Sequence, residues 1–320
     1  MQKNLVVTGP TATGKTKLAV YLARKFGGEI VSADSRQVYK RLDIGTGKDL
    51  NEYTTGGEPV PFHQIDIVGP DEEYNLMQFL FDSVPVINDI HGRGKLPVIE
   101  GGTPLYIDAL VSGYEMKGAP PDKNLRSSLE KLDTDALLEL LSEKDSSAYN
   151  KLKNLRNRLR IIRAIERADC TDPVPVPPAL SEDTQWLLLG VYFHRSEIRS
   201  RIAERLEKRL KSGMIEEAKR LHESGLPWER MEFLGLEYRY LAYFLQGKLS
   251  YDEMEEQLLI KIRQFAKRQD IWFRKMEREG HVIHWIRHGD KSVAEELVRR
   301  FLADEPLPEP ELRISEIKYS

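Results

Sequence analysis

The segment Gly9-Pro10-Thr11-Ala12-Thr13-Gly14-Lys15-Thr16 has the residue types and spacing of a phosphate-binding loop, or P-loop. Its two glycines let the backbone turn and approach a ligand closely, and N–H groups at the start of a following helix face an anion. Lys15 adds a positive charge, and the Thr16 hydroxyl can hold Mg²⁺. We therefore predict that residues 9–16 bind a phosphate or diphosphate, with Thr16 as a metal ligand.

A P-loop needs a strand before it and a helix after it, and the sequence predicts both. Leu5-Val6-Val7 is typical of a short buried strand, and residues 17–26 have apolar positions at helical spacing. The same patterns predict strands at 29–32, 96–99, 186–193 and 281–286, and helices at 74–91 and 291–302. This alternation predicts an α/β fold, a P-loop NTPase-like doubly wound parallel sheet. Ligands bind such sheets at the strand carboxyl ends, where Gly9, Asp34 and Gly101 fall.

The pattern changes from about Gly113, where a charged and entirely helical stretch begins. Pro120-Pro121 precedes this stretch and Asp172-Pro173-Val174-Pro175-Val176-Pro177-Pro178 follows it, so we expect hinges at both places. We predict an inserted helical subdomain over 113–184 and an α/β core over 1–112 and 185–303 whose C-terminal part is helical. The remaining tail, 304–320, is rich in Pro and Glu and is expected to be poorly ordered.

Composition limits the class of protein. A chain of 320 residues with 40% hydrophobic content can bury a sizeable core. No apolar run approaches the roughly 20 residues of a membrane-spanning helix, and Met1-Gln2-Lys3 leads into a strand rather than a signal peptide, so we expect a cytoplasmic protein that does not enter the membrane. The single cysteine, Cys170, excludes an internal disulfide and a multi-cysteine metal site. No sustained heptad or unused apolar stripe is evident, so we expect a monomer.

Positive charge is gathered into three segments, although the whole chain carries a net charge of only −3. Residues 151–168 carry +6, residues 195–211 carry +4 and residues 261–275 carry +5, so the rest of the chain carries −18. A mildly acidic protein with a few strongly basic helices suits a polyanion that binds on one side.

Four further motifs follow the P-loop in a specific order: Ser32-Ala33-Asp34-Ser35-Arg36-Gln37-Val38-Tyr39, Asp43-Ile44-Gly45-Thr46-Gly47-Lys48, Gly101-Gly102-Thr103-Pro104-Leu105-Tyr106 and Arg263-Gln264-Phe265-Ala266-Lys267-Arg268-Gln269. With them, the chain resembles tRNA dimethylallyltransferases from about Leu5 to Trp285. The resemblance implies transfer of a dimethylallyl group from dimethylallyl diphosphate to the exocyclic N6 amine of the adenosine next to the anticodon on its 3′ side. Diphosphate is released, the implied cofactor is Mg²⁺, and the implied partner is the anticodon stem-loop of tRNA.

The resemblance also implies roles for single residues. Asp34 matches the general base that takes the proton from the amine; an acid that holds metal through water is the alternative. Arg201 matches an arginine that is expected to reach the diphosphate beside the catalytic residues Lys15 and Thr16. The alternative is that Arg201 is an exposed charge on the surface of a helix. Thr103 matches a contact to the target nucleotide; a helix N-cap is the alternative, and one hydroxyl can serve both roles.

The residues implied to contact tRNA are polar and mostly basic, and the inserted subdomain contributes three of them. For a single arginine, a solvated helix face explains the charge as well as a phosphate contact does, and capping of a strand end explains Ser32 and Ser35 nearly as well. The complete set is Ser32, Asp34, Ser35, Arg36, Gln37, Thr103, Arg158, Arg160, Arg163, Arg263, Gln264, Lys267, Arg268 and Gln269.

Three departures from the family pattern affect mainly the details of tRNA recognition. Pro104 stands where a third glycine is usual, Lys153-Asn154-Leu155 replaces a His-Pro-Asn-Asp run, and Leu236-Glu237-Tyr238-Arg239 replaces the usual residues after a glycine.

Other functions are compatible with a P-loop. A prenyltransferase acting on free adenine nucleotides would not need three basic segments. A small-molecule kinase would need arginines that close over ATP, which these motifs do not identify, and an RNA-binding protein with a vestigial P-loop would not need intact Lys15, Thr16 and Asp34.

Overall fold

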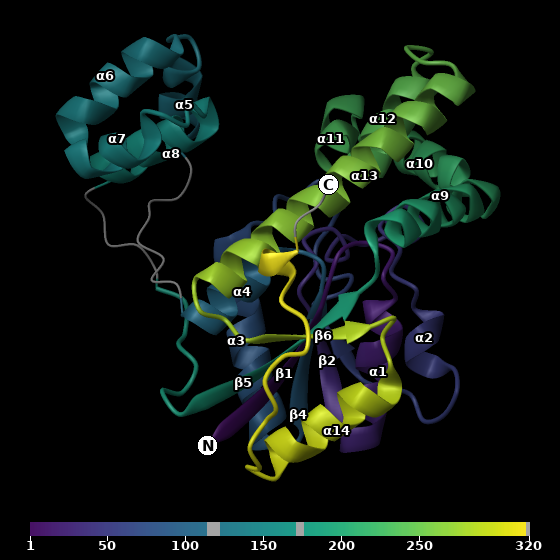
Figure 1. Ribbon diagram of the computed structural model, residues 1–320. Coiled ribbons are helices and arrows are strands. Elements are labelled where there is room, and N and C mark those ends of the chain that lie inside the picture. The colour runs from purple at the N-terminus through teal and green to yellow at the C-terminus, as the bar shows by residue number, and fades with distance from the viewer. Residues whose placement is uncertain (114–121, 171–175, 318–320) are drawn as a thin grey trace. The chain divides into compact units, whose positions relative to one another are not determined.

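The computed structural model describes residues 1–113, 122–170 and 176–317 (Figure 1). The chain divides into two compact units, one made of Met1–Gly113 with Pro178–Ser320 and the other of Tyr114–Pro177. The expected hinge at Pro120-Pro121 lies outside the described residues, and so do residues 172–175 of the hinge expected at 172–178.

The first unit is built on a six-stranded sheet in the order β3-β2-β4-β1-β5-β6, and every neighbouring pair is parallel. This confirms the predicted doubly wound parallel α/β fold. Strand β3 was not expected, because an edge strand of two residues is too short to show a pattern of apolar residues in the sequence. The strands are β1 (Gln2–Thr8), β2 (Gly28–Ser32), β3 (Phe62–His63), β4 (Leu96–Gly101), β5 (Thr184–Tyr192) and β6 (Ile283–Arg287).

The helices predicted at 17–26, 74–91 and 291–302 are present, each beginning within two residues of the predicted start. No helix of the described residues is long and apolar enough to cross a membrane. The helices of the first unit are α1 (Lys15–Phe26), α2 (Asn51–Thr54), α3 (Leu76–Gly92), α4 (Pro104–Ser112), α9 (Arg195–Lys211), α10 (Met214–Glu223), α11 (Trp228–Phe233), α12 (Leu236–Leu245), α13 (Tyr251–Arg278) and α14 (Lys291–Leu302), with a 3₁₀ turn, η1 (Ile314–Glu316).

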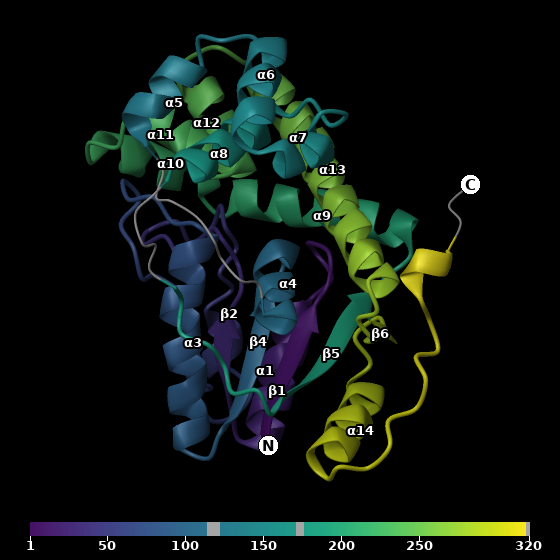
Figure 2. The same ribbon diagram turned by 90° about the vertical axis from the view of Figure 1, so that its left-hand side faces the viewer.

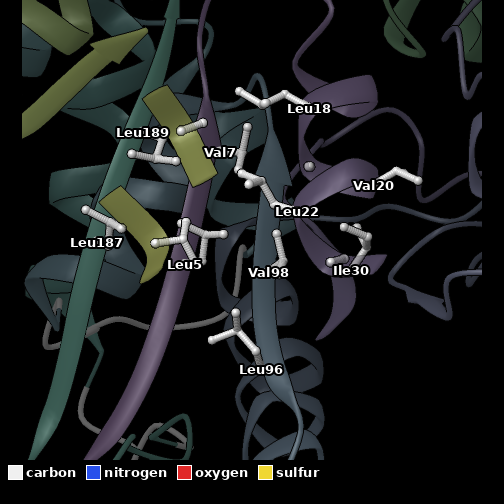
Figure 3. Packing of buried hydrophobic residues seen from close by; sticks show 14 of the residues in the cluster. Leu5, Val7, Leu18, Val20, Leu22, Ile30, Leu96, Val98, Leu187 and Leu189 are labelled. Atoms are coloured by element: carbon white, nitrogen blue, oxygen red, sulfur yellow. The ribbon is translucent and has the colours of Figure 1, made fainter. Parts of the chain in front are cut away.

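Helices cover both faces of the sheet, which is why the central strands are apolar throughout rather than alternating. Helices α1 and α14 contact one face, and α3 and α4 contact the other (Figure 2). On the first face, Leu5 and Val7 of β1 pack with Leu18 and Leu22 of α1, all at most 3% exposed (Figure 3). This packing holds β1 and α1 in place on either side of the P-loop.

Helices α9 to α13 share a second apolar core with the loop that follows β2. Ile202 and Leu206 of α9, Leu241 of α12 and Leu258 of α13 are buried in it together with Leu42 of the loop. Helices α9 to α12 and the first part of α13 lie beyond the carboxyl ends of the strands (Figure 1), so the second core brings their polar faces to the end of the sheet where the P-loop lies.

The tail is ordered where it is described, contrary to expectation. Ile314 is 2% exposed. The Glu277 carboxylate accepts hydrogen bonds from the backbone N–H groups of Ile314 at 3.2 Å and Ser315 at 2.6 Å. A composition rich in Pro and Glu therefore does not prevent docking when one apolar side chain is buried and a partner satisfies the backbone.

The second unit contains α5 (Lys123–Leu129), α6 (Thr134–Lys144), α7 (Ser146–Leu152) and α8 (Arg158–Asp169) around a small apolar core. Glu166 is 2% exposed and is bonded by Arg126 at 2.6 Å and by Arg163 at 3.0 Å. Burial alone would raise the pKa of Glu166, but the two arginines hold it below its usual value. Arg163 thus has a structural partner within this unit.

Candidate active site

The P-loop joins the end of β1 to the start of α1 in a backbone conformation that its small residues permit. Gly9, Ala12 and Gly14 have positive φ angles of 146°, 65° and 79°. A Cβ atom at Gly9 would lie 2.9 Å from the carbonyl oxygen of Val191, so the close approach to β5 requires glycine there. The N-cap residue of α1, Gly14, makes no side-chain hydrogen bond to the helix, so the first N–H groups of α1 can donate to an anion.

Two side chains from distant helices hold this loop. The Gln269 amide of α13 accepts a hydrogen bond from the Thr11 N–H at 2.8 Å and donates one to the Gly102 carbonyl. The Arg201 Nε of α9 donates to the Ala12 carbonyl at 2.7 Å. The P-loop is therefore attached both to the end of β4 and to the C-terminal helices.

Glu100, near the end of β4, lies directly beside the P-loop and was not singled out from the sequence. Its carboxylate is 1% exposed, and its Oε1 accepts a hydrogen bond from the Thr16 hydroxyl at 3.0 Å. Burial raises the pKa of Glu100 to about 7, although the nearby Lys15 charge and the bond from Thr16 favour the charged form. An acidic residue at the end of an apolar run was the available signal.

Asp34 follows β2, and the backbone N–H of Arg36 donates to its Oδ1 at 2.9 Å. Next to it, the Thr103 hydroxyl accepts a hydrogen bond from the Ser35 N–H at 3.0 Å and donates to the Ser35 hydroxyl at 3.3 Å. Thr103 occupies the N-cap position of α4, but its hydroxyl makes no cap hydrogen bond to the helix. Its hydroxyl instead fixes the loop that carries Asp34.

Three arginines follow one another at intervals of four residues on α9, on the side that faces the P-loop. The Arg201 guanidinium lies 4.3 Å from the centre of the Phe193 ring, and Arg205 donates to the Thr11 hydroxyl. Burial and the neighbouring Arg209 lower the pKa of Arg205 to about 9, so it stays charged at neutral pH. Arg205 and Arg209 were not predicted, although the spacing from Arg201 was a visible signal.

The loop 43–48 is fixed by a buried acid of α10. Glu217 accepts hydrogen bonds from the N–H groups of Asp43, Ile44 and Gly45 at 2.8–2.9 Å and from the Tyr238 hydroxyl at 2.6 Å. Above this loop, Arg209 lies so close to Gly47 that any Cβ atom there would collide with the guanidinium. The motif is thus a scaffold that closes one side of the site.

These elements enclose a cavity of about 580 Å³, a size suited to small ligands. It brings together side chains from the P-loop, from the ends of β2 and β4, and from α9 and α13. Among its lining residues are Thr11, Ala12, Gly14, Lys15, Thr16, Asp34, Ser35, Arg36, Gln37, Thr103, Arg201, Arg205, Arg209, Glu237 and Arg268.

A second cavity of about 590 Å³ lies between β5, α9 and α13 and is lined largely by apolar side chains. Pro10 of the P-loop and three residues predicted to contact tRNA, Arg263, Gln264 and Lys267, line this second cavity and not the first. The basic residues of α13 therefore point to two different faces, because Arg268 lies on the other side of the helix.

The remaining predicted tRNA contacts line neither of the two cavities. Gln269 and Ser32 are buried, at 3% and 0% exposure, and each has an internal hydrogen-bond partner. The Ser32 hydroxyl bonds to Gln37 at 3.4 Å. Arg158, Arg160 and Arg163 belong to α8 of the second unit, where Arg158 donates to the Glu130 carbonyl. Arg160 is exposed.

Comparison with known proteins assigns the chain to a family. A family model described as IPP transferase matches residues 37–276, and one described as isopentenyl transferase matches residues 2–67. The chain belongs to the IPP transferase family. It is 46% identical over 305 residues to tRNA dimethylallyltransferase 2 of Pelobacter propionicus, covering 94% of each chain. It is also 46% identical to tRNA dimethylallyltransferase 1 of Syntrophus aciditrophicus, covering 93% of this chain and 98% of the relative.

Solved structures of IPP transferases share the fold. The tRNA isopentenylpyrophosphate transferase of Bacillus halodurans is 30% identical with a TM-score of 0.68, covering 95% of this chain and 96% of that one. A eukaryotic dimethylallyltransferase acting on tRNA is 25% identical with a TM-score of 0.77, covering 97% of this chain and 81% of that one. These likenesses confirm the family expected from the motifs.

Proposed function

We propose that this enzyme transfers a dimethylallyl group from dimethylallyl diphosphate to the N6 amine of the adenosine 3′-adjacent to the anticodon of tRNA. The observation that carries this proposal is the cavity in which Lys15, Thr16 and Arg201 share one space with Asp34 and Thr103. The anion-binding P-loop and the Asp34 carboxylate, which can accept a proton, therefore face the same cavity. Family membership supports the same reaction.

The P-loop side of the cavity would hold the diphosphate. Lys15, Arg201 and the first N–H groups of α1 supply positive charge and hydrogen-bond donors to a leaving group. As the carbon–oxygen bond of the donor breaks, the diphosphate takes the electron pair, and the added negative charge meets donors that are already in position.

The opposite side of the cavity would hold the adenine. An adenine stacked in an anticodon loop hides its amine, so the base must be moved out of the stack into the cavity. Its N6 forms the new bond to the prenyl carbon, and the N6 proton passes to Asp34. Thr103 and Ser35, bonded to each other at 3.3 Å, hold the loop that positions this carboxylate.

The residues present also fit Mg²⁺. Thr16 would hold the ion, because its hydroxyl proton is donated to Glu100 while its lone pairs remain for a cation. When bound, Mg²⁺ neutralises part of the charge on the diphosphate. The exposed arginines of α8 and α13 would contact phosphates of the tRNA backbone. Such contacts provide affinity without reading the base sequence. The cytoplasmic location and the monomeric state stay predictions.

The test is incubation of the protein with dimethylallyl diphosphate, Mg²⁺ and one of three acceptors: unmodified tRNA, AMP or ATP. Nucleoside analysis should detect N6-dimethylallyladenosine in tRNA and no product from either free nucleotide. Prenylation of AMP or ATP but not tRNA would favour the adenine-nucleotide prenyltransferase instead. A reaction that consumes ATP and leaves dimethylallyl diphosphate intact would favour a kinase.

A further inference from the structure

Glu100 has an unused oxygen in a place where a buried carboxylate is costly. It lies near the carboxyl end of the central strand β4, opposite Val7 of β1 and Ser32 of β2. The side chain is 1% exposed, and its Oε2 has no hydrogen-bond partner among the described residues. Burying a carboxylate with an oxygen left unpaired is unfavourable unless another group completes its environment.

The neighbouring hydroxyl indicates which group that is. A threonine hydroxyl has one proton to donate and two lone pairs. Thr16 donates its proton to Glu100 at 3.0 Å, so its lone pairs stay available to a cation. A carboxylate and a hydroxyl oxygen side by side are ligands that suit Mg²⁺, which typically takes one or two carboxylates together with waters and substrate phosphates.

The described part of the chain holds no group of three or more His, Cys, Asp or Glu side chains that could bind a metal, so an ion at Thr16 would have few protein ligands. Asp34 and Asp49 line the cavity with Thr16, whereas the Glu100 carboxylate is hydrogen-bonded directly to the Thr16 hydroxyl at 3.0 Å. Glu100 also lies near the Lys15 ammonium, so a counter-ion for Lys15 is the competing role.

We propose that Glu100 is a metal-binding residue that, directly or through one water, helps Thr16 hold Mg²⁺ in the absence of the diphosphate. The inference rests on the proposed function for the identity of the ion, and it adds that the enzyme binds the metal without its donor. A site of Thr16 alone would acquire the ion only together with the diphosphate.

The experiment measures binding of Mn²⁺, a spectroscopically visible substitute for Mg²⁺, to the full chain without donor or tRNA, using the electron paramagnetic resonance signal of free Mn²⁺. Wild-type protein should bind one ion competitively with Mg²⁺. Glu100→Gln, which preserves shape, should weaken that binding about 10- to 100-fold, as losses around metal sites commonly do. Thr16→Val should also weaken it.

The matched control is Glu52→Gln, because Glu52 is a carboxylate that lines the cavity into which Thr16 also faces. It should change the Mn²⁺ affinity less than about threefold, a screened charge effect. Glu100→Asp, which retains the charge, should recover part of the affinity lost in Glu100→Gln, and thermal unfolding of each variant checks folding.

Three results would overturn the proposal: no Mn²⁺ bound by wild-type protein without donor, unchanged Mn²⁺ affinity in Glu100→Gln, or an equal loss in Glu52→Gln. If Glu100→Gln bound inorganic diphosphate more weakly but bound Mn²⁺ normally, Glu100 would instead be the counter-ion of Lys15. Because none of these readouts is prenylation, failure of the proposed reaction and failure of the metal site are separate outcomes.

Discussion

The side-chain carbonyl of Gln269 accepts a hydrogen bond from the backbone N–H of Thr11 at 2.8 Å, although the two residues are 258 positions apart. The amide is 3% exposed, and its nitrogen donates to the carbonyl of Gly102. A Cβ atom at Gly102 would lie 2.9 Å from that nitrogen and 3.2 Å from the Lys15 ammonium. One buried amide thus sets the distance between the P-loop and the end of β4.

Replacing Gln269 with Leu should therefore loosen the P-loop. The change leaves the Thr11 N–H and the Gly102 carbonyl buried without partners, which costs about 1–3 kcal/mol of unfolding free energy. Urea denaturation should show this loss, and calorimetric titration should show weaker binding of diphosphate. Gln264→Leu, an exposed glutamine on the same helix, is the control and should stay within about 0.5 kcal/mol. Weaker tRNA binding with unchanged diphosphate binding would instead favour the tRNA contact predicted from the sequence.

Lys15→Ala tests the diphosphate cradle. Loss of a charge that stabilises the leaving group costs roughly 2–4 kcal/mol in the transition state, so turnover should fall by orders of magnitude. Inorganic diphosphate should inhibit the wild-type enzyme competitively against the donor in steady-state kinetics. Lys25→Ala, at the far end of α1 where Lys25 pairs with Glu295, should keep normal turnover. A requirement for ATP would count against the cradle.

Arg160→Ala and Lys267→Ala test the basic helices of the two units. Each should weaken tRNA binding in a filter-binding assay and reduce the slope of affinity against salt by about one counter-ion for each phosphate that the variant no longer neutralises. Donor binding should not change. Lys219→Ala on α10, exposed and paired with Glu223, serves as the control. If either variant lost affinity for donor and tRNA equally, its side chain would not be a tRNA contact.

Local signals predicted the parts of this molecule whose causes are local. Gly9, Gly14 and Lys15 are recognised from spacing alone because the P-loop conformation depends on adjacent residues. Gln269 and Glu100 were missed in their structural roles because their partners, Thr11 and Thr16, come from other segments of the chain. The sequence around a single polar residue in an apolar segment does not indicate which distant atom that residue will contact.

The tail shows the same limit in the opposite direction. Its composition predicts disorder, yet Ile314 is buried because Glu277 on α13 accepts the N–H groups of the turn. Thr103 likewise stands at the N-cap of α4, the alternative that its position offered to a nucleotide contact, but its hydroxyl bonds to the Ser35 loop and not to the helix. Tertiary partners decided both cases, and a single sequence does not name them.

Glu29 on β2 is expected to make the stability of the fold depend on pH. It is 5% exposed, and its hydrogen bond with Arg93 lowers the pKa of its carboxyl, with a further contribution from His63. The folded-state pKa lies below the unfolded value of about 4.3. The pair therefore stabilises the fold above that pH, and the stabilisation is lost as pH falls through the folded-state pKa.

Glu29→Gln should lower the unfolding free energy by about 1–3 kcal/mol at pH 7. The difference from wild type should shrink toward pH 3, measured by urea denaturation across the pH range. Glu73→Gln, an exposed acid of the same unit, should show little difference at either pH. A gap between Glu29→Gln and wild type that stayed constant from pH 7 to pH 3 would show that the charge of Glu29 is not the stabilising element.

Asp34→Asn tests the step on which the proposed reaction depends. The amine of adenine is a poor nucleophile until the prenyl carbon becomes electron deficient, and the proton on N6 must then leave. Asparagine keeps the size of the side chain and its ability to accept from the Arg36 N–H, which Asp34 now does at 2.9 Å. It cannot take up a proton. Binding of donor and tRNA should therefore stay nearly normal while single-turnover prenylation slows roughly 10²- to 10⁴-fold.

The controls for Asp34→Asn separate proton transfer from metal binding and from general charge. Asp49→Asn removes an exposed negative charge at the same cavity and should change the single-turnover rate much less. If Asp34 mainly held Mg²⁺ through water, Asp34→Asn would raise the Mg²⁺ concentration needed for half-maximal rate, and excess metal would restore part of the activity. A general base gives the opposite result, because no concentration of Mg²⁺ supplies an acceptor for the N6 proton. Rescue by metal, or a rate within a few-fold of wild type, would therefore remove Asp34 from this role.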